Sequence, residues 1–290
     1  MYRYRGKIWS EADIERIRCI IAIAPGVDRA KLARQVCEVF DWRMRDGQLK
    51  QMACRVAMLR MQDDGLIQLP PSRAKPRSRI SGADFTSAAS DPQPNLDISV
   101  SELKDLRLEL VAKGKPLRLW NEFIARYHYL GYGVMPGAQL RYFIKSEEQI
   151  LGVMGFGGAA WKVAPRDTFI GWTASEREKN LHLIINQTRF LILPWVRCQN
   201  LASKSLAMAK RRIGKDWQER YAYTPVLLET FVDTSKFHGT CYKADNWTCV
   251  GLTQGRTRND RLNTISVPVK SIWVFPLVPH FRQELLGQHD

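Results

Sequence analysis

The sequence predicts an α+β protein of two domains joined by a basic linker, and three observations lead to this fold class. Apolar residues recur at helical spacing within residues 1–71, which predicts a small helical domain. Serine, proline, alanine and arginine dominate residues 72–98, a composition typical of a linker. Within residues 99–290, short apolar runs alternate with amphipathic stretches, which predicts a mixed sheet covered by helices.

The first domain is expected to be a helix-turn-helix unit of the winged-helix kind. Ser10 can cap a first helix that has acidic residues in its first turn, and a short turn joins the second and third helices. The expected elements are helices at residues 10–24, 29–40 and 48–63, and a short strand or wing at 66–69.

The charge balance favours a polyanionic partner. The 290 residues include 44 Lys and Arg against 29 Asp and Glu, a formal net charge of +15. Residues 1–80 hold 17 of the basic and 9 of the acidic residues, so about half of the excess lies in the first domain and linker. Such an excess on a folded chain favours nucleic acid over a membrane as partner. The alternative is that the charge serves only to keep the protein soluble.

The third predicted helix carries cations that can meet DNA. A recognition helix needs basic side chains that are free to contact phosphates and base edges. The alternative is a solvated face on a helical docking domain. The expected nucleic-acid-binding residues lie on this helix or just before it: Arg43, Arg45, Lys50, Arg55 and Arg60.

Cysteine and histidine usage predicts neither a disulfide framework nor a metal site. The six cysteines are scattered without a CxxC pair, and the five histidines lack metal-ligand spacing. No apolar run reaches membrane-spanning length, and the first residues lack a signal-peptide core. We therefore expect a cytoplasmic protein with no membrane partner and no bound metal.

The second domain is expected to alternate helices and strands. Leucines at helical spacing after Ser101 predict a helix, and the run of apolar residues after Asn186 predicts a buried strand. The expected helices are 101–113, 119–127, 175–181, 201–220 and a short one at 242, and the expected strands are 139–144, 150–156, 169–172, 186–196, 226–233 and 249–250.

Residues 225–258 gather the most varied polar chemistry in the chain. Glu229 and Asp233 share one face of a predicted strand, but four residues at strand rise separate their Cα atoms by about 13 Å. They cannot share a metal ion directly, although each remains a catalytic candidate. The alternative for Glu229 is an ion pair with Arg189 or Arg256.

Tyr242 is a second catalytic candidate, as a general acid or as a nucleophile activated by Lys243 or His128. His128 itself is a candidate proton shuttle between two tyrosines. The alternative for Tyr242 is a packed side chain. Arg256 and Arg258, in a glycine-flanked loop, are expected to contact phosphate.

The order strand, polar loop, long helix, strand, short helix and strand resembles the C-terminal half of the GCN5-related N-acetyltransferases. The segments RCQNLA, with Arg197, Asn200 and Ala202, and YKADNW, with Tyr242, match the pyrophosphate loop and last helix of that family. The resemblance implies a coenzyme A pyrophosphate at the first segment and its sulfur near the tyrosine. Asparagine stands where that family has glycine in both segments, so no cofactor is expected, with coenzyme A as the alternative.

Several further segments resemble the Druantia anti-phage protein A family over nearly the whole chain. They are RYHYLGY, RDTFIGW, RFLILPWV, ETFVD and GTCYKADNW, in that order. The resemblance implies a role in bacterial phage defence, with DNA and other defence-system proteins as partners.

The combined function hypothesis is a DNA-binding component of bacterial anti-phage defence, or a mobile-element-associated relative. Its acetyltransferase-like domain would be repurposed for nucleic acid. The alternatives are a coenzyme A-dependent acyltransferase and a DNA-cleaving enzyme, so the sequence leaves open whether the protein is an enzyme.

Overall fold

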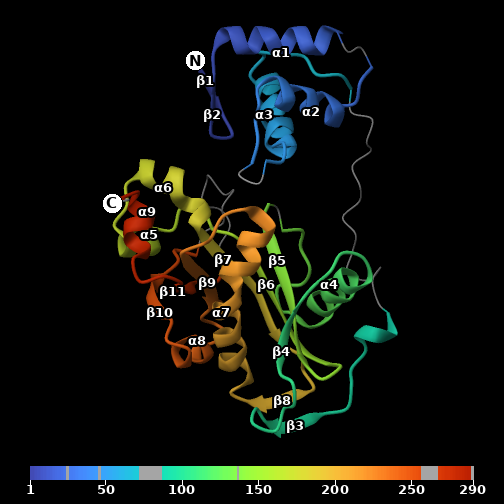
Figure 1. The fold of residues 1–290 in the computed structure, drawn as a ribbon, viewed down its shortest axis with the longest axis vertical. Coiled ribbons are helices and arrows are strands. Elements are labelled where there is room, and N and C mark those ends of the chain that lie inside the picture. The colour runs from blue at the N-terminus through green and yellow to red at the C-terminus, as the bar shows by residue number, and fades with distance from the viewer. Residues whose placement is uncertain (24–25, 45–46, 72–86, 136, 256–266, 289–290) are drawn as a thin grey trace. The chain divides into compact units, whose positions relative to one another are not determined.

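The computed structural model describes residues 1–23, 26–44, 47–71, 87–135, 137–255 and 267–288. The chain forms two compact units, Met1–Ile80 and Ser81–Asp290, and the division falls inside the predicted linker (Figure 1). Short pieces of that linker are folded as parts of the second unit: the 3₁₀ helix Ala88–Ser90 and strand β3 (Leu96–Ser99).

The first unit is a small helical core that is preceded in the chain by a β-hairpin. Strands β1 (Tyr2–Tyr4) and β2 (Lys7–Trp9) pair antiparallel, a hairpin that the sequence did not predict. The Trp9 side chain is fully buried and meets the rings of Phe40 and Trp42 edge to face. The three predicted helices are present as α1 (Glu11–Ile23), α2 (Arg29–Val39) and α3 (Gln51–Asp63).

The predicted wing is wrong. Residues 66–69 form no strand, because their backbone groups bond to side chains of the helical core. The amide of Leu69 donates to Oε1 of Gln62 at 3.1 Å, and Nε of Arg18 donates to the Leu66 carbonyl at 2.8 Å. The connection between α2 and α3 is also longer than a tight turn, with a bridge between Arg43 and Leu49. A helix-turn-helix function for this unit therefore stays a prediction.

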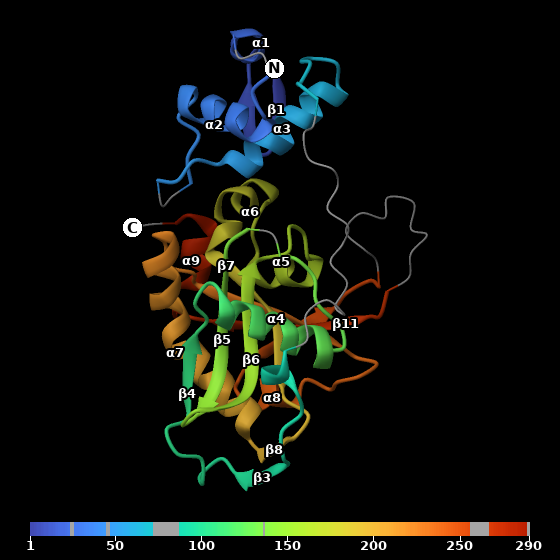
Figure 2. The same ribbon diagram turned by 90° about the vertical axis from the view of Figure 1, so that its right-hand side faces the viewer.

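The second unit is built on one seven-stranded mixed sheet of order β10-β11-β9-β7-β6-β5-β4 (Figures 1 and 2). All neighbours pair antiparallel except β7 and β9, which are parallel. A separate parallel pair joins β3 to β8 (Val196–Gln199). The sheet strands are β4 (Arg107–Leu110), β5 (Gln139–Ser146), β6 (Gln149–Gly158), β7 (Ile184–Ile192), β9 (Leu227–Asp233), β10 (Thr248–Leu252) and β11 (Lys270–Pro276).

The parallel pair between β7 and β9 is short. It joins Ile184–Gln187 to Leu227–Thr230, and beyond these positions both strands continue without pairing to each other. A bulge lies at the same point of β7: Gln187 faces Phe156 and Arg189 faces Gly155, so Thr188 between them has no partner in β6. We call the region beyond the last paired residues the β7–β9 split.

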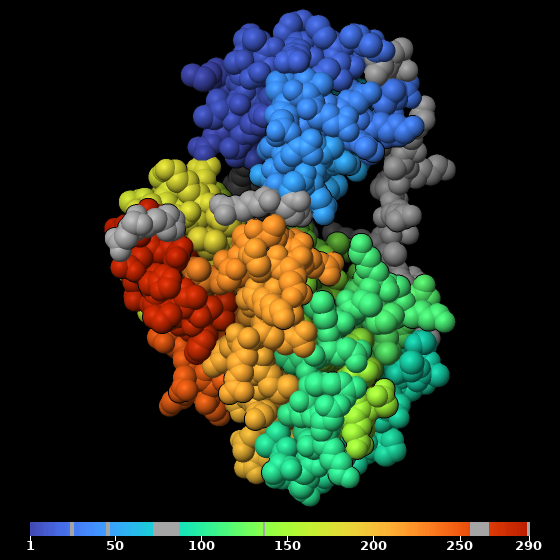
Figure 3. All heavy atoms as spheres, in the orientation of Figure 1, coloured from blue at the N-terminus to red at the C-terminus, as the bar shows by residue number. Residues whose placement is uncertain are grey.

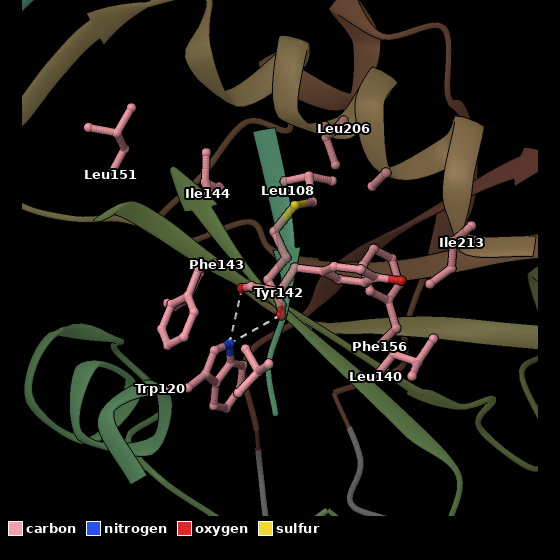
Figure 4. Packing of buried hydrophobic residues seen from close by; sticks show 14 of the residues in the cluster. Leu108, Trp120, Leu140, Tyr142, Phe143, Ile144, Leu151, Phe156, Leu206 and Ile213 are labelled. Atoms are coloured by element: carbon pink, nitrogen blue, oxygen red, sulfur yellow. Dashed lines mark hydrogen bonds between the residues drawn. The ribbon is translucent and has the colours of Figure 1, made fainter. Parts of the chain in front are cut away.

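Helices cover both faces of the sheet. The longest, α7 (Leu201–Tyr221), crosses one face and lies on the molecular surface there (Figure 3), while α4 (Lys115–Tyr127) packs on the opposite face (Figure 4). Beside α7 lies the short α8 (Thr240–Ala244). The remaining helices are α5 (Ala164–Ile170), α6 (Ala174–Asn180), the 3₁₀ helix Leu181–Leu183 and α9 (Phe281–Leu286).

Two predicted elements of this unit are wrong. Residues 101–113 form turns and the edge strand β4 in place of a helix, because pairing with β5 satisfies the backbone and buries Leu108. Residues 169 and 170 end α5 and residues 171 and 172 follow it, so no strand forms there. The Asp167 side chain accepts the Val163 amide at 3.3 Å, and Gly171 ends the helix in a left-handed conformation.

Trp120 of α4 holds its face of the sheet together. Its indole nitrogen donates to the carbonyls of Tyr142 and Met154, on β5 and β6, at 3.3 and 3.2 Å (Figure 4). The ring lies directly over Gly155, where an added Cβ would be 3.0 Å from the indole. Glycine at this position is therefore what allows the tryptophan to approach the sheet.

Replacing Gly155 with alanine is expected to destabilise the second unit by about 1–3 kcal/mol, because the new methyl group overpacks the tryptophan. Gly158→Ala, on the same strand, is the matched control, since nothing lies within 4 Å of a Cβ there. Urea unfolding checks both variants. Equal free energies of unfolding for the two variants would contradict the Trp120 contact.

Candidate functional site at the β7–β9 split

The paired ladder next to the closed end of the split holds a buried ion pair. Glu229, opposite Asn186 in the parallel pair, is fully buried. Its Oε1 accepts the Ala160 amide at 2.8 Å, and its Oε2 accepts Nη1 of Arg166 at 2.7 Å. Burial raises the pKa of Glu229, and the Arg166 guanidinium opposes the shift. The sequence had suggested Arg189 or Arg256 as partner, so the actual partner was missed.

The guanidinium of Arg166, also fully buried, ties α5 to the sheet. Besides Glu229 it contacts Oδ1 of Asp167 at 2.7 Å and the Ala160 carbonyl at 2.8 Å. Oδ2 of Asp167 lies 3.4 Å from Nη1 of Arg177. Two carboxylates and two guanidinium groups thus neutralise each other. The arrangement gives Glu229 a structural partner at each oxygen, and its catalytic role stays a prediction.

Tyr242, on α8, lies in an aromatic cluster. Its ring meets Trp247 at 5.2 Å, Trp273 at 6.3 Å and Phe190 of β7 at 6.5 Å between centroids. Burial raises the pKa of Tyr242, which keeps its hydroxyl protonated near neutral pH. A protonated phenol is a poor nucleophile, and the Lys243 side chain proposed to activate it is exposed. The geometry therefore favours packing over nucleophilic attack.

The two other predicted catalytic residues, Asp233 and His128, each lie near Tyr129. Asp233 ends β9, and its Oδ1 accepts the amide and the hydroxyl of Ser235 at 3.0 and 2.6 Å. These hydrogen bonds lower the pKa of Asp233, so the carboxylate is ionised near neutral pH. His128 follows α4, and its Nδ1 accepts the Leu130 amide at 3.2 Å. Neither side chain contacts Glu229.

Burial and the nearby Arg189 cation lower the pKa of His128 to about 4. The imidazole is therefore neutral at pH 7, with its ring stacked on Tyr129 at 4.9 Å. The ring of Tyr129 in turn meets Phe237, from the turn after β9, at 5.4 Å. We call residues 128–132 the aromatic loop.

Two half-buried arginines line the same face of the sheet as the aromatic loop. Arg141 on β5 and Arg189 on β7 are both register partners of Gly155, so they form one row across three strands. Nη1 of Arg189 donates to the Thr188 carbonyl, and Nη2 of Arg141 donates to Oε1 of Gln139, both at 2.7 Å. No carboxylate within the described ranges pairs with either arginine. Sequence reasoning missed this row, because only the register brings its members together.

The predicted pyrophosphate positions adopt part of the expected geometry. Asn200 begins α7 with φ of 64°, the left-handed conformation that glycine would supply. Ala202 lies in the first turn of α7, and Arg197 is exposed on β8. However, β8 is extended and paired with β3, so residues 196–199 do not wrap around the helix start. The fit to a coenzyme A pyrophosphate is therefore partial.

The predicted DNA-contacting cations divide into three groups. Arg43 is already paired with Asp41, at 2.5 Å, and donates to the Gly47 carbonyl at 3.0 Å. On or next to α3, none of the remaining described cations forms an ion pair with a carboxylate that the structure describes. These cations are Lys50, Arg55 and Arg60. Three predicted residues lie outside the described residues: Arg45, Arg256 and Arg258.

In the described part of the chain, no group of three or more His, Cys, Asp or Glu side chains could hold a metal ion. Nor does any helix there combine the length and apolar character needed to cross a bilayer.

Comparison with known proteins gives one family match. The model of the family described as "Druantia protein DruA" matches residues 61–287. A search of curated proteins gives no match.

Three of the solved structures that resemble this chain are described as acetyltransferases or as an acyl amino acid synthase. A Bacillus subtilis acetyltransferase in complex with CoA is 10% identical, with a TM-score of 0.36, and the match covers 60% of this chain and 100% of that one. FeeM, an N-acyl amino acid synthase from uncultured soil microbes, is 14% identical, with a TM-score of 0.39 and coverage of 65% and 98%. The microcin C7 self-immunity acetyltransferase MccE is 11% identical, with a TM-score of 0.31 and coverage of 48% and 61%. In the present structure, the predicted order of β7, α7, β9, α8 and β10 is present, but strand β8 stands between β7 and α7 where a polar loop was predicted.

Glu229→Gln is expected to destabilise the second unit by on the order of 3 kcal/mol, because it leaves the buried Arg166 guanidinium undercompensated. The matched control is Glu109→Gln, which breaks the ion pair with Lys145 at the sheet edge. That loss should stay below about 1 kcal/mol, because Glu109 is exposed. Denaturant unfolding measures both, and comparable small losses would contradict a tightly coupled buried pair.

His128 is expected to make stability depend on pH between about 4 and 6.5, its folded and ordinary pKa values. In this window the unfolded chain binds the proton more readily, so the free energy of unfolding falls as the pH falls. His128→Asn should therefore lose less stability than wild type between pH 7 and pH 5. His238→Asn, at an exposed position, is the control. Identical pH profiles for wild type and His128→Asn would show that the buried imidazole does not titrate as described.

Proposed function

We propose, from the premise that this chain belongs to the Druantia protein DruA family, that it is a DNA-binding component of bacterial anti-phage defence. The family supplies the defence context. The proposal that the component binds DNA depends on one observation in the first unit: α3 presents cations that no described carboxylate neutralises.

The geometry of α3 separates its core from its outer face. The helix buries one side in the core of the first unit, through residues Cys54, Ala57, Met58 and Met61. Arg55 and Arg60 project from the rest of its surface and are exposed, with Lys50 half-buried at the helix start. Cations that no described carboxylate neutralises are available to phosphates, and contacts with phosphates position a protein on DNA whatever the sequence. The net charge of +15 supports the same partner.

The second unit supports a nucleic-acid role better than acyl transfer. Its candidate coenzyme loop is an extended strand, and its candidate catalytic tyrosine is packed among aromatic rings. Arg141 and Arg189, which pair with no carboxylate among the described residues, by contrast suit an anionic ligand. A DNA-cleaving activity receives no comparable support, because the oxygens of Glu229 are already engaged by Ala160 and Arg166.

A double variant, Arg55→Gln with Arg60→Gln, is expected to bind duplex DNA more weakly than wild type. For two lost phosphate contacts, the slope of log Kobs against log salt should become shallower by about 1.8. Gel-shift titration at several salt concentrations measures this slope. The control is Arg34→Gln with Lys215→Gln, which removes the same charge from residues that form ion pairs on other helices. The proposal fails if wild type does not bind DNA, or binds it with an affinity that does not change with salt.

A second candidate, coenzyme A-dependent acyl transfer, is favoured by two local features. Asn200 starts α7 in a left-handed conformation without a side-chain cap on the helix, so the first-turn amides remain open to an anion. Gln187, where β7 and β9 part, is buried, and neither polar atom of its amide has a partner among the described residues. Calorimetry with acetyl-coenzyme A tests this candidate. Absence of both heat and a thermal shift would remove it.

A further inference from the structure

We propose that the aromatic loop, Phe237 and Arg189 together form a binding site for single-stranded nucleic acid. In this site a base stacks on the Tyr129 ring or on the Phe237 ring, and a neighbouring phosphate meets the Arg189 guanidinium. The inference rests on the proposed nucleic-acid function and deepens it, because it names the strand form and the contact residues in the second unit.

The stacking surface consists of aromatic rings that the fold leaves open. Tyr129 is 39% exposed and Phe237 is 49% exposed, and their centroids lie 5.4 Å apart. Beneath them the His128 ring stacks on Tyr129 and is held by the Leu130 amide. Exposed aromatic rings backed by a fixed ring are a platform for unpaired bases, which stack on any π-face with little sequence preference.

The platform is assembled from distant segments and held in place by the fold. Tyr129 follows α4, whereas Phe237 follows β9, more than one hundred residues later. Upstream of the loop, the Tyr127 hydroxyl donates to the Ser90 carbonyl at 2.8 Å, and Arg126 pairs with Asp91 at 2.7 Å. The fold, and not a single local segment, therefore holds the two rings next to each other.

The charges around the platform favour an anion. Lys236 lies 6.0 Å from the Tyr129 ring, and Lys270 is the register partner of Asp233. Among the described carboxylates, Asp233 is the one whose charge raises the pKa of Tyr129. Its Oδ1 already accepts two hydrogen bonds from Ser235. With Arg189 included, three cations therefore outweigh one carboxylate.

Arg189 supplies the cation of the proposed site. Its guanidinium is half-buried beside the loop, where Nη2 lies 3.9 Å from the position of a Cβ on Gly133. A partly desolvated cation without a counter-ion is costly, and a phosphate would supply the missing charge. Arg141 lies two strands away in the same row, about 10 Å across the sheet, and is likewise without a carboxylate among the described residues. Its guanidinium lies over the Trp120 ring, 5.1 Å from the ring centroid, and offers a second phosphate contact.

This combination favours a single strand over a duplex. In a duplex the bases are stacked on one another and their faces are not available to protein rings, whereas an unpaired base can lie flat on Tyr129 or Phe237. The backbone of the same strand would then pass the row of arginines.

The test measures binding of fluorescently labelled oligothymidylate to the full chain by anisotropy. Tyr129→Leu with Phe237→Leu is expected to weaken binding about 10-fold or more, because two stacking surfaces are lost. Tyr129→Phe keeps the ring and should bind within about twofold of wild type. Arg189→Gln should make the salt slope shallower by about 0.7, whereas Lys215→Gln, an exposed cation on α7 paired with Glu219, should leave it unchanged.

The outcomes separate this inference from the function on which it rests. Loss of oligothymidylate binding in the leucine double variant, with duplex binding and thermal unfolding retained, supports the site. Equal binding of oligothymidylate by wild type, the leucine double variant and Arg189→Gln overturns the inference but leaves the DNA-binding function intact. If wild type binds neither single strands nor duplex, the proposed function itself fails. Binding of coenzyme A in competition with the oligonucleotide would assign the site to the cofactor and overturn the inference.

Discussion

The parallel pairing of β7 with β9 is the constraint on which the second unit depends. Parallel neighbours cannot be joined by a tight turn, so the chain must cross over the sheet, and α7 is that crossover. Because the pairing ends after Gln187 and Thr230, the two strands part inside the sheet. One end of the split is closed by the Glu229–Arg166 pair, and the other opens beneath the aromatic loop. Glu229 and Arg189 owe their positions to that short ladder and to the bulge beside it.

The fully buried and the half-buried arginines of the second unit have different partners. Arg166 is fully buried and meets carboxylates from a helix and from a strand, so its charge is neutralised inside the protein. Arg141 and Arg189 are only partly buried, and within the described residues their hydrogen-bond acceptors are a side-chain amide and a backbone carbonyl. The first arrangement stabilises the packing of α5 on the sheet. The second arrangement leaves positive charge at a surface, where an anionic ligand can neutralise it.

The sequence predicted most elements but few of the contacts. Long periodic segments such as α7 and the β5–β6 hairpin were predicted correctly, because their patterns are local. The helix predicted at 101–113 was wrong because a tertiary partner, β5, outweighed its leucine spacing. The partner of Glu229 could not be found from sequence, since Arg166 lies on a helix 63 residues earlier. The row that contains Arg141 and Arg189 depends on strand register, which no local pattern records.

The bulge at Thr188 has a consequence for how such a site can change. Side chains alternate between the faces of a strand, so one extra residue in β7 turns the remainder of the strand over. It is this bulge that places Arg189 opposite Gly155, on the same face as the aromatic loop. If Thr188 instead took the place opposite Gly155, Arg189 would lie opposite Met154 and on the face that carries α7 and α8, while the sheet itself could still form. Within a family built on this sheet, the presence or absence of the bulge can therefore decide whether the split is cationic.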